Sequence, residues 1–209
     1  MKLPYSLRGN QKEIIESIRS TLHNRSHIVL ESPTGSGKTF CSLAAALPFA
    51  IENELRIVYC ARTNSQQKQV IHELRQFKKS GYPVSAVAFQ GRGSLCPEQN
   101  YDKELKKSNW VEKSKMCKSL KMQSKIGEAG CRFYRKLIRG SVLLVEEWSS
   151  DILTAEEFSE QAEESGICPY ELNKLLVKDA RVVIVPYVYF FEEFIRNFML
   201  GRMGTSIDN

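Results

Sequence analysis

The sequence has no apolar run that approaches the roughly 20 residues of a membrane-spanning helix. Its first residues also lack the apolar core and the cleavage site of a signal peptide. We therefore expect an intracellular protein with no membrane partner, in the cytoplasm of a prokaryote or the nucleus of a eukaryote. Thiols stay reduced in those compartments, so the six cysteines are not expected to form disulfides. Burial as small apolar side chains, or a metal, must account for them.

Positive charge is missing from one long stretch. Residues 141–173 contain no Lys or Arg and nine Asp or Glu, which gives a net charge of −9. The two stretches before it are basic, since residues 1–95 and residues 96–140 each carry a net charge of +7. Basic regions of this density favour a polyanionic partner such as nucleic acid. A solvated lysine-rich surface is the alternative that charge alone leaves open.

Internal repeats and linkers rich in Pro, Gly or Ser are absent as well. Strand-like and helix-like segments alternate instead, which predicts an α/β fold with a parallel sheet. The expected strands are residues 27–30, 56–61, 84–88 and 181–186, and the expected helices are residues 11–22, 41–47, 65–77, 154–164 and 190–200. Because the pattern breaks at residue 91, we expect one α/β domain, residues 1–90 and 170–209, interrupted by an insertion at residues 91–169.

A glycine-rich loop ending in Gly-Lys-Thr lies between the first expected strand and the helix after it. Its residues are Ser32, Pro33, Thr34, Gly35, Ser36, Gly37, Lys38 and Thr39. In a phosphate-binding P-loop, glycines let backbone N–H groups turn toward an anion beside a helix N-terminus. Lys38 would reach the β- and γ-phosphates of a nucleotide, and Thr39 would hold Mg²⁺. Ser32 departs from the glycine that opens the P-loop pattern, and an ordinary strand–turn–helix is the alternative.

Four of the cysteines belong to the insertion, at Cys96, Cys117, Cys131 and Cys168. They are separated by 20, 13 and 36 residues, and no pair has the C-x₂-C step of zinc ribbons and bacterial ferredoxins. Spacing alone leaves open that they are scattered core cysteines, the interpretation that we prefer for Cys41 and Cys60. The insertion, however, is too poor in apolar residues to fold by packing alone. Four thiolates could bind Zn²⁺ or hold a 4Fe-4S cluster.

Several short sequences around these residues occur together and in one order. They are Arg8-Gly9-Asn10-Gln11, the loop at 32–39, Ala61-Arg62-Thr63-Asn64-Ser65-Gln66, Arg92-Gly93-Ser94-Leu95-Cys96-Pro97, Cys117-Lys118-Ser119-Leu120, Cys131-Arg132-Phe133-Tyr134, Cys168-Pro169-Tyr170-Glu171 and Asp179-Ala180-Arg181-Val182 with the apolar residues after it. With them, the whole chain resembles the N-terminal part of the XPD family of superfamily 2 DNA helicases. The cysteine-containing sequences are specific to that family, whereas Gly-Lys-Thr alone is not.

The resemblance implies a RecA-like P-loop domain with a parallel sheet, interrupted by a small, mainly helical 4Fe-4S cluster domain. It implies that the four insertion cysteines ligate the cluster, and it is the reason to expect iron–sulfur rather than zinc. It also implies an ATP-dependent DNA helicase that uses ATP with Mg²⁺ and moves on single-stranded or forked DNA with 5′→3′ polarity. Repair and transcription complexes are the protein partners that it suggests.

The same resemblance assigns roles to polar residues outside the loop. Arg8 and Gln11 would form an adenine-side motif, although a Gln at a helix start is more often a cap or a surface residue. Arg62, Thr63 and Asn64 would contact the backbone of single-stranded DNA, or cap the helix that follows. Further candidates for DNA binding are Arg92, Lys118 and Arg132, with Lys115, Lys121 and Arg135 extending the basic surface around the cysteines.

One acidic segment imitates a catalytic motif. Residues 142–147 end in two glutamates, like a Walker B strand, but place Glu where Asp is expected, so we interpret them as structural. In the XPD family the Asp-Glu-Ala-His box comes shortly after the position where this chain ends. We therefore expect a fragment that binds nucleotide weakly and has little or no ATPase activity by itself.

Three alternatives stay open at this point. A DinG-like iron–sulfur helicase is the nearest, because only the cysteine-containing sequences separate it from the XPD type. A nucleic-acid-binding module with a relic P-loop is the second. A P-loop phosphotransferase with a structural zinc is the third, and the identity of the metal would test it directly.

Overall fold

The computed structural model describes residues 2–204, apart from the side chains at positions 110, 141–144, 146 and 147. The chain end at residues 206–209, on which the expectation of a following Asp-Glu-Ala-His box depends, lies outside the described residues. The strands are β1 (Ile57–Ala61), β2 (Ala86–Ala88) and β3 (Val182–Pro186). The helices are α1 (Gln11–His23), α2 (Lys38–Glu52), α3 (Asn64–Lys79), α4 (Arg92–Leu95), the 3-10 helix η1 (Pro97–Asn100), α5 (Lys103–Lys107), α6 (Trp110–Lys125), α7 (Arg132–Trp148), α8 (Ala155–Glu164), α9 (Pro169–Leu176), α10 (Val188–Phe191) and α11 (Glu193–Met203).

The three strands form a parallel sheet in the order β1-β3-β2, as the sequence predicts for these segments. The central strand pairs Val182 with Ile57 on one side and with Ala86 on the other. Residues Val182–Val185 of β3 are all buried, which explains why this strand is continuously apolar rather than alternating. The sheet therefore needs helices on both faces.

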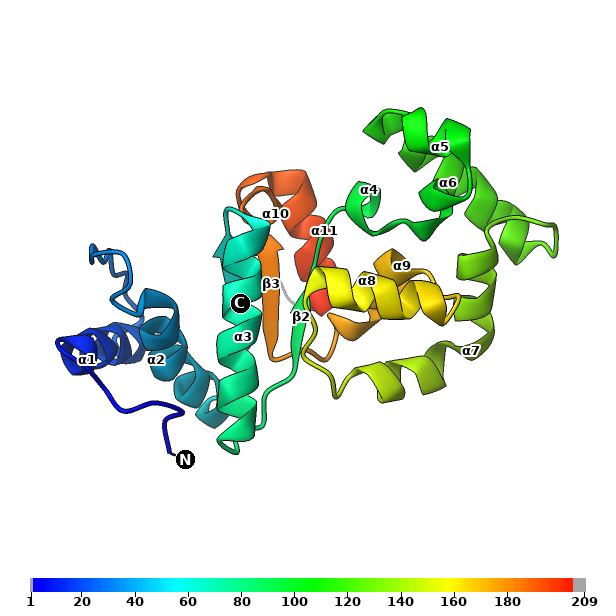
Figure 1. Cartoon of the computed structure of the whole chain (residues 1–209). Coiled ribbons are helices and arrows are strands. Elements are labelled where there is room, and N and C mark those ends of the chain that lie inside the picture. The colour runs from blue at the N-terminus through cyan, green and yellow to red at the C-terminus, as the bar shows by residue number, and fades with distance from the viewer. Residues whose placement is uncertain (1, 205–209) are drawn as a thin grey trace.

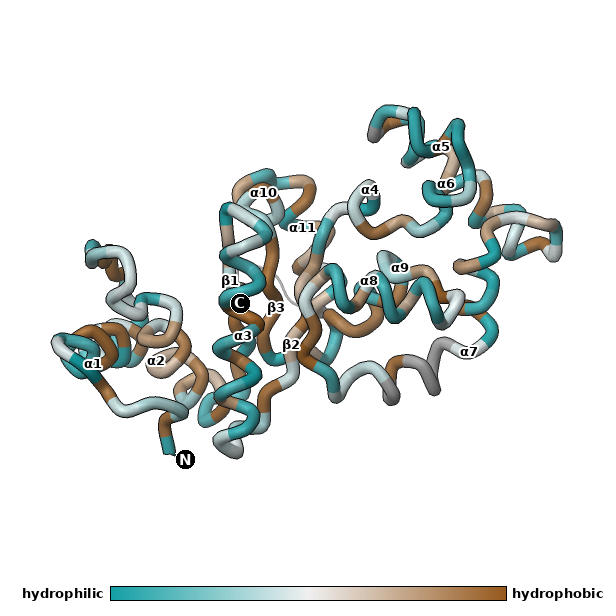
Figure 2. Tube along the Cα trace, in the orientation of Figure 1, coloured by the Kyte–Doolittle hydropathy of each residue, from teal (hydrophilic) through white to brown (hydrophobic). Residues whose placement is uncertain are grey.

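Alternate side chains of β3 meet different helices. Val182 and Ile184 belong to a cluster with the apolar face of α3, which includes Leu74 and Phe77. Val183 and Val185 belong to a second cluster, formed with the apolar faces of α9 and α11. Figure 1 shows α3 over the sheet, with α1 and α2 on one side of it and α4 to α9 on the other. Apolar residues gather along the strands in Figure 2, whereas α5 and α6 are largely hydrophilic. None of the helices in the described part of the chain is long and apolar enough to cross a membrane.

Several helices begin where the sequence supplies a reciprocal cap. Thr63 accepts a hydrogen bond from the backbone N–H of Gln66, whose side chain accepts in return, at the start of α3. Thr154 and Glu157 make the same arrangement at the start of α8. Such capping boxes satisfy backbone donors that the first helical turn leaves free. They explain why α3 and α8 begin close to the predicted positions.

The expected strand at residues 27–30 is wrong. This segment has no regular secondary structure, and Val29 in its centre is 99% exposed. A strand needs a neighbouring backbone as a partner, and within residues 2–204 the sheet contains only β1, β3 and β2. Helices α1 and α2 pack against each other, and the connection between them runs outside the sheet.

The apolar stretch at residues 142–147 lies within α7 and is helical, which agrees with the interpretation that it is structural and not a Walker B strand. One other segment differs in detail from the sequence prediction. The helix expected at residues 190–200 is divided into α10 and α11, which meet at Glu192 in an extended backbone conformation. Residues 91–169 are otherwise helical, as predicted for the insertion.

The acidic part of the insertion is docked on the basic side of α3. Lys68 lies 3.2 Å from Glu156, and Arg75 forms an ion pair with Glu157. The Arg75 guanidinium also donates to the Ile152 carbonyl at 2.7 Å. Two glutamates of the acidic stretch therefore pair with basic side chains of α3, so part of its negative charge is neutralised within the fold.

We expect this attachment to weaken in acid. The hydrogen bond from Arg75 holds the pKa of Glu157 below its usual value, against the opposing effect of burial. The stabilisation is complete above the ordinary carboxyl pKa of about 4.3 and is lost as the pH falls through the lower folded-state value. Glu157→Gln should lower the free energy of unfolding by up to about 1 kcal/mol at pH 7, because both partners are partly exposed. The loss should be smaller at pH 3, where the wild-type carboxylate is itself largely protonated. Urea unfolding at the two pH values measures this, with Glu160→Gln on the same helix as the control. A cost that is equal at both pH values would contradict it.

Candidate functional site

The glycine-rich loop leads directly into α2. Gly35 and Gly37 have φ values of 82° and 84°, in the left-handed region that favours glycine. Gly37 is also the residue before α2, and no side chain caps this helix. The Lys38 ammonium donates to the backbone carbonyls of Ser32 and Pro33, at 2.6 and 2.8 Å.

Two hydroxyl groups in the same loop are buried without a hydrogen-bond partner among the described residues. They belong to Ser32 and Ser36. A buried hydroxyl is costly to leave unpaired, and both could donate to an anion held by the loop. Together with the uncapped N-terminus of α2, this donor-rich loop suits a phosphate group.

Gln11 connects the start of α1 to this loop. Its Oε1 accepts from the backbone N–H of Arg8, and its Nε2 donates to the carbonyl of Ser36, both at 3.0 Å. A Cβ atom on Gly37 would lie 2.6 Å from Gln11 Nε2, so a larger residue there would displace this side chain as well as strain the left-handed backbone. The structure thus brings the predicted adenine-side pair and the phosphate loop together.

These residues border the largest of the pockets described for the chain. It is open to solvent and has a cavity volume of about 540 Å³, within the range of small-molecule sites. Its wall includes an aromatic contact between Tyr5 and Phe40, whose ring centroids are 5.2 Å apart. The lining residues are Pro4, Tyr5, Ser6, Arg8, Gln11, Gly37, Phe40 and Glu73.

The four insertion cysteines line one small cavity, although they come from separate parts of the chain. Cys117 lies within α6. The other three directly precede η1, α7 and α9: Cys96, Cys131 and Cys168. A position before a helix favours a thiolate, because backbone N–H groups of the first turn point toward it. Cys41 is fully buried in α2 and Cys60 lies in β1, as expected for core cysteines.

Burial dominates the electrostatics of these thiols. It raises the pKa of Cys131 to about 11 and that of Cys168 to about 12, and it also raises the pKa of Cys96. Backbone N–H groups partly oppose the rise, those of Tyr134 and Phe133 at Cys131 and that of Glu171 at Cys168. Ionising these thiols together therefore requires compensating positive charge, which bound metal provides.

In the part of the chain that the structure describes, no three His, Cys, Asp or Glu side chains are close enough to share one metal ion. In a 4Fe-4S cluster each thiolate binds a different iron, so its ligands surround a larger volume. Four thiols around one cavity are the donor set of such a cluster.

Arg92 lies on the wall of the same cavity. Its Nη1 donates to the hydroxyl and the carbonyl of Ser114, at 2.9 and 3.4 Å, and its guanidinium carbon lies 4.9 Å from the centre of the Tyr170 ring. Its Nε is buried and has no hydrogen-bond partner among the described residues. Arg92 therefore keeps one unpaired donor on the side chain that lines the cysteine cavity.

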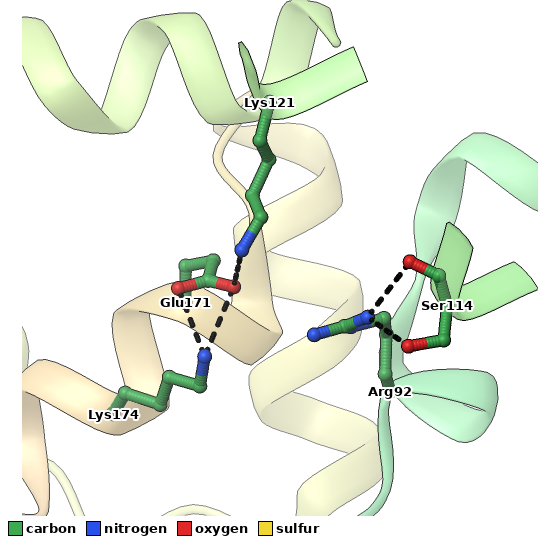
Figure 3. Close-up of polar contacts among 5 residues, drawn as sticks. All are labelled: Arg92, Ser114, Lys121, Glu171 and Lys174. Atoms are coloured by element: carbon green, nitrogen blue, oxygen red, sulfur yellow. Dashed lines mark hydrogen bonds and ion pairs between the residues drawn. The ribbon is translucent and has the colours of Figure 1, made fainter. Parts of the chain in front are cut away.

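An ion-paired group joins two of the cysteine-bearing helices (Figure 3). Glu171 of α9 accepts from Lys121 of α6 at 2.7 Å and from Lys174 at 3.1 Å. Burial disfavours the Glu171 carboxylate, but its hydrogen bond with Lys121 and the charge of Lys174 outweigh this and lower its pKa. Lys121 is therefore paired within the fold and does not extend an exposed basic surface as the sequence suggests.

The predicted DNA-binding residues at 62–64 lie between β1 and α3. The Thr63 hydroxyl accepts from the Gln66 N–H at 3.2 Å, which confirms the capping interpretation. The Asn64 side chain accepts from Gln90 at 3.3 Å, and the same Gln90 nitrogen reaches buried Gln67. Gln90, which the sequence interpretation missed, thus links this turn to the chain just before Arg92.

The other two candidates lie on the surface of the insertion. Lys118 is exposed on α6, one residue after Cys117. Arg132 is exposed at the start of α7, with its guanidinium carbon 3.8 Å from the centre of the Tyr101 ring. Stacking of this kind restrains the side chain without neutralising its charge.

Residues 59–207 match the sequence profile of the family described as DEAD_2. The Regulator of telomere elongation helicase 1 homolog of Arabidopsis thaliana is 27% identical over an alignment of 243 residues, gaps included. The alignment covers 99% of this chain and 22% of the relative. The human Regulator of telomere elongation helicase 1 is 25% identical over 224 residues, which cover 87% of this chain and 17% of the relative. The chain thus spans about a fifth of the length of these relatives.

Two solved structures share the fold. One, titled Truncated XPD, aligns with a TM-score of 0.57 at 21% identity and covers 90% of this chain and 48% of its own. The other, titled XPD_Helicase, aligns with a TM-score of 0.59 at 20% identity and covers 97% of this chain and 31% of its own. The arrangement of strands and helices described above is therefore one already seen in solved proteins.

Proposed function

Since the chain belongs to the DEAD_2 family, as the N-terminal region of an XPD/DinG-type superfamily 2 helicase, we propose that it forms part of the motor of an ATP-dependent DNA helicase. The observation that carries the proposal is the position of Gln11, which joins Arg8 to the carbonyl of Ser36. That contact supports a nucleotide site in which Arg8 and Gln11 lie on the adenine side of the glycine-rich loop.

In this proposal ATP is bound with Mg²⁺ by the glycine-rich loop. Lys38 contacts the β- and γ-phosphates and Thr39 holds the metal, as their order in the loop requires. The buried hydroxyls of Ser32 and Ser36 supply further donors, and Thr34, Gly35 and Gly37 shape the loop. Arg8 and Gln11 line the pocket on the base side.

Residues 1–90 and 170–209 would form the first RecA-like motor domain, and residues 91–169 the cluster domain. We assign a 4Fe-4S cluster to Cys96, Cys117, Cys131 and Cys168, supported by the cavity that they share. When bound, the cluster supplies a rigid cross-link to a region with few apolar residues. Arg92 and the backbone N–H groups beside the sulfurs stabilise its negative charge.

Single-stranded or forked DNA is the proposed substrate. Arg62, Thr63 and Asn64 lie at a helix N-terminus, where phosphate contacts are favourable. Arg92, Lys118 and Arg132 would continue the path across the insertion. ATP-driven movement along the strand, with 5′→3′ polarity and with repair or transcription proteins as partners in the nucleus or cytoplasm, is part of the proposal.

Replacing Lys38 with alanine tests nucleotide binding. The change removes an ammonium hydrogen bond to phosphate, worth about 1.5–3 kcal/mol, so ATP affinity should fall about 10- to 100-fold. Calorimetric titration of the chain with Mg²⁺–ATP measures this, and Lys12→Ala on the exposed side of α1 is the matched control. Equal affinity of Lys38→Ala and the wild type would remove the ATP-binding part of the proposal.

A further inference from the structure

A buried carboxamide lies next to the turn at residues 62–64. Gln90 is only 8% exposed and follows the end of β2 by two residues. Its Nε2 group donates to the side-chain oxygens of Asn64 and Gln67, at 3.3 Å in each case. A carboxamide nitrogen carries two hydrogens, so these two bonds use both of its donors.

Gln90 and one of its two partners are fixed in the core. The backbone N–H of Phe89, the residue before Gln90, donates to the Ile184 carbonyl of β3 at 2.8 Å, and Phe89 is fully buried. Gln67 of α3 is 3% exposed. Asn64 is the exposed partner. The contact with Gln90 therefore restrains the Asn64 side chain rather than the reverse.

This restraint decides which end of the Asn64 amide stays free. Its oxygen is held by Gln90, and its nitrogen makes no hydrogen bond among the residues that the structure describes. An NH₂ group donates, so it suits a phosphate oxygen, whereas a free amide oxygen would repel one. Arg62 beside it is exposed and cationic, and Asn64 begins α3, where the helix dipole favours an anion.

We propose that Gln90 is a positioning residue that holds the Asn64 amide with its NH₂ group toward a phosphate of the bound DNA strand. The inference rests on the proposed function, since it concerns the nucleic acid that residues 62–64 would bind. Gln90 does not itself contact DNA; it fixes the Asn64 rotamer before binding. Arg92, two residues after Gln90, borders the cysteine cavity. The same carboxamide thus ties the DNA-binding turn to the start of the insertion.

The test is a double-mutant cycle on the affinity of the anaerobically purified chain for labelled oligothymidylate, followed by fluorescence anisotropy. Asn64→Ala should weaken binding about tenfold, the usual effect of losing one hydrogen bond to a charged group. Gln90→Asn should weaken it about two- to tenfold, because the Asn64 side chain must then be ordered on binding. The double variant should bind within about twofold of Asn64→Ala, since Gln90 acts only through that side chain.

The variants are chosen so that the fold is kept. Gln90→Asn leaves a carboxamide at the buried position, but both bonds of Gln90 are already long, so a side chain one methylene shorter breaks them. Gln161→Asn, the same change at an exposed position of α8, is the matched control and should leave the affinity unchanged. Asn64→Asp changes only an exposed residue. It still accepts from Gln90 but presents an anion to the phosphate, so it should bind more weakly than Asn64→Ala.

The salt dependence separates the loss of one neutral contact from a general loss of structure. Gln90→Asn and Asn64→Ala should leave the slope of log affinity against log salt unchanged, whereas Arg62→Ala should reduce it by about 0.7. Additive effects of Gln90→Asn and Asn64→Ala, or a reduced slope for Gln90→Asn, would overturn the inference alone. A wild-type chain that does not bind the oligonucleotide would overturn the proposed DNA substrate, and the inference with it.

Discussion

Cys168→Ser is expected to lose the iron–sulfur cluster together with the folded arrangement of the insertion. Cys168 is 9% exposed and directly precedes α9, and its backbone N–H donates to the Phe133 carbonyl at 3.1 Å. This residue therefore joins α9 to α7 at the cavity. Because ligand binding and folding are coupled in such modules, loss of one ligand should unfold much of the region.

Metal analysis after anaerobic purification measures the effect. The wild type should contain about four irons and four acid-labile sulfides per chain with visible absorption, and the variant close to none. Limited proteolysis should then cut the variant within residues 91–169. Cys60→Ser, in β1 and outside the cavity, should keep the iron. One zinc without sulfide in the wild type would support the phosphotransferase alternative instead.

Glu171→Leu is expected to be the most destabilising change of a charged side chain. The variant leaves Lys121 and Lys174 without their carboxylate, and Lys174 is only 8% exposed (Figure 3). Burial already lowers the pKa of Lys174, although the charge of Glu171 opposes this. Breaking a buried pair by removing one partner costs about 3–5 kcal/mol, so the free energy of unfolding should fall by that amount.

Denaturant unfolding of the purified protein checks this value. Glu164→Leu, at the exposed end of α8, introduces the same side chain without breaking a pair and should change stability by less than about 0.5 kcal/mol. A similarly small loss for Glu171→Leu would mean that the two lysines find other partners. The acid would then not be needed to hold α6 and α9 together.

The sequence predicts well what depends on local patterns. The predictions of β1, β2 and β3 are confirmed, and each of these strands is a short apolar run in an alternating α/β order. The predictions of α3 and α8 are confirmed as well, and each of these helices begins at a capping box. The run at residues 27–30 shows the limit of such patterns. Apolar character cannot show whether a pairing strand is available, and Val29 lies exposed.

Pairings between distant residues could not be predicted. Glu171 and Lys121 are 50 positions apart, and only the folded chain, in which α6 and α9 both pack against α7, brings the two charged residues together. Gln90 reaches Asn64 in the same way, across 26 positions.

The central place of β3 has a consequence for how the chain is made. Its partners β1 and β2 both precede the insertion, whereas β3 follows it. During synthesis on the ribosome, two apolar strands therefore emerge long before the strand that joins them, and they stay open to association with other chains. Early compaction of the insertion would shorten the loop that must close. Folding of the insertion and completion of the sheet are thereby connected in time as well as in space.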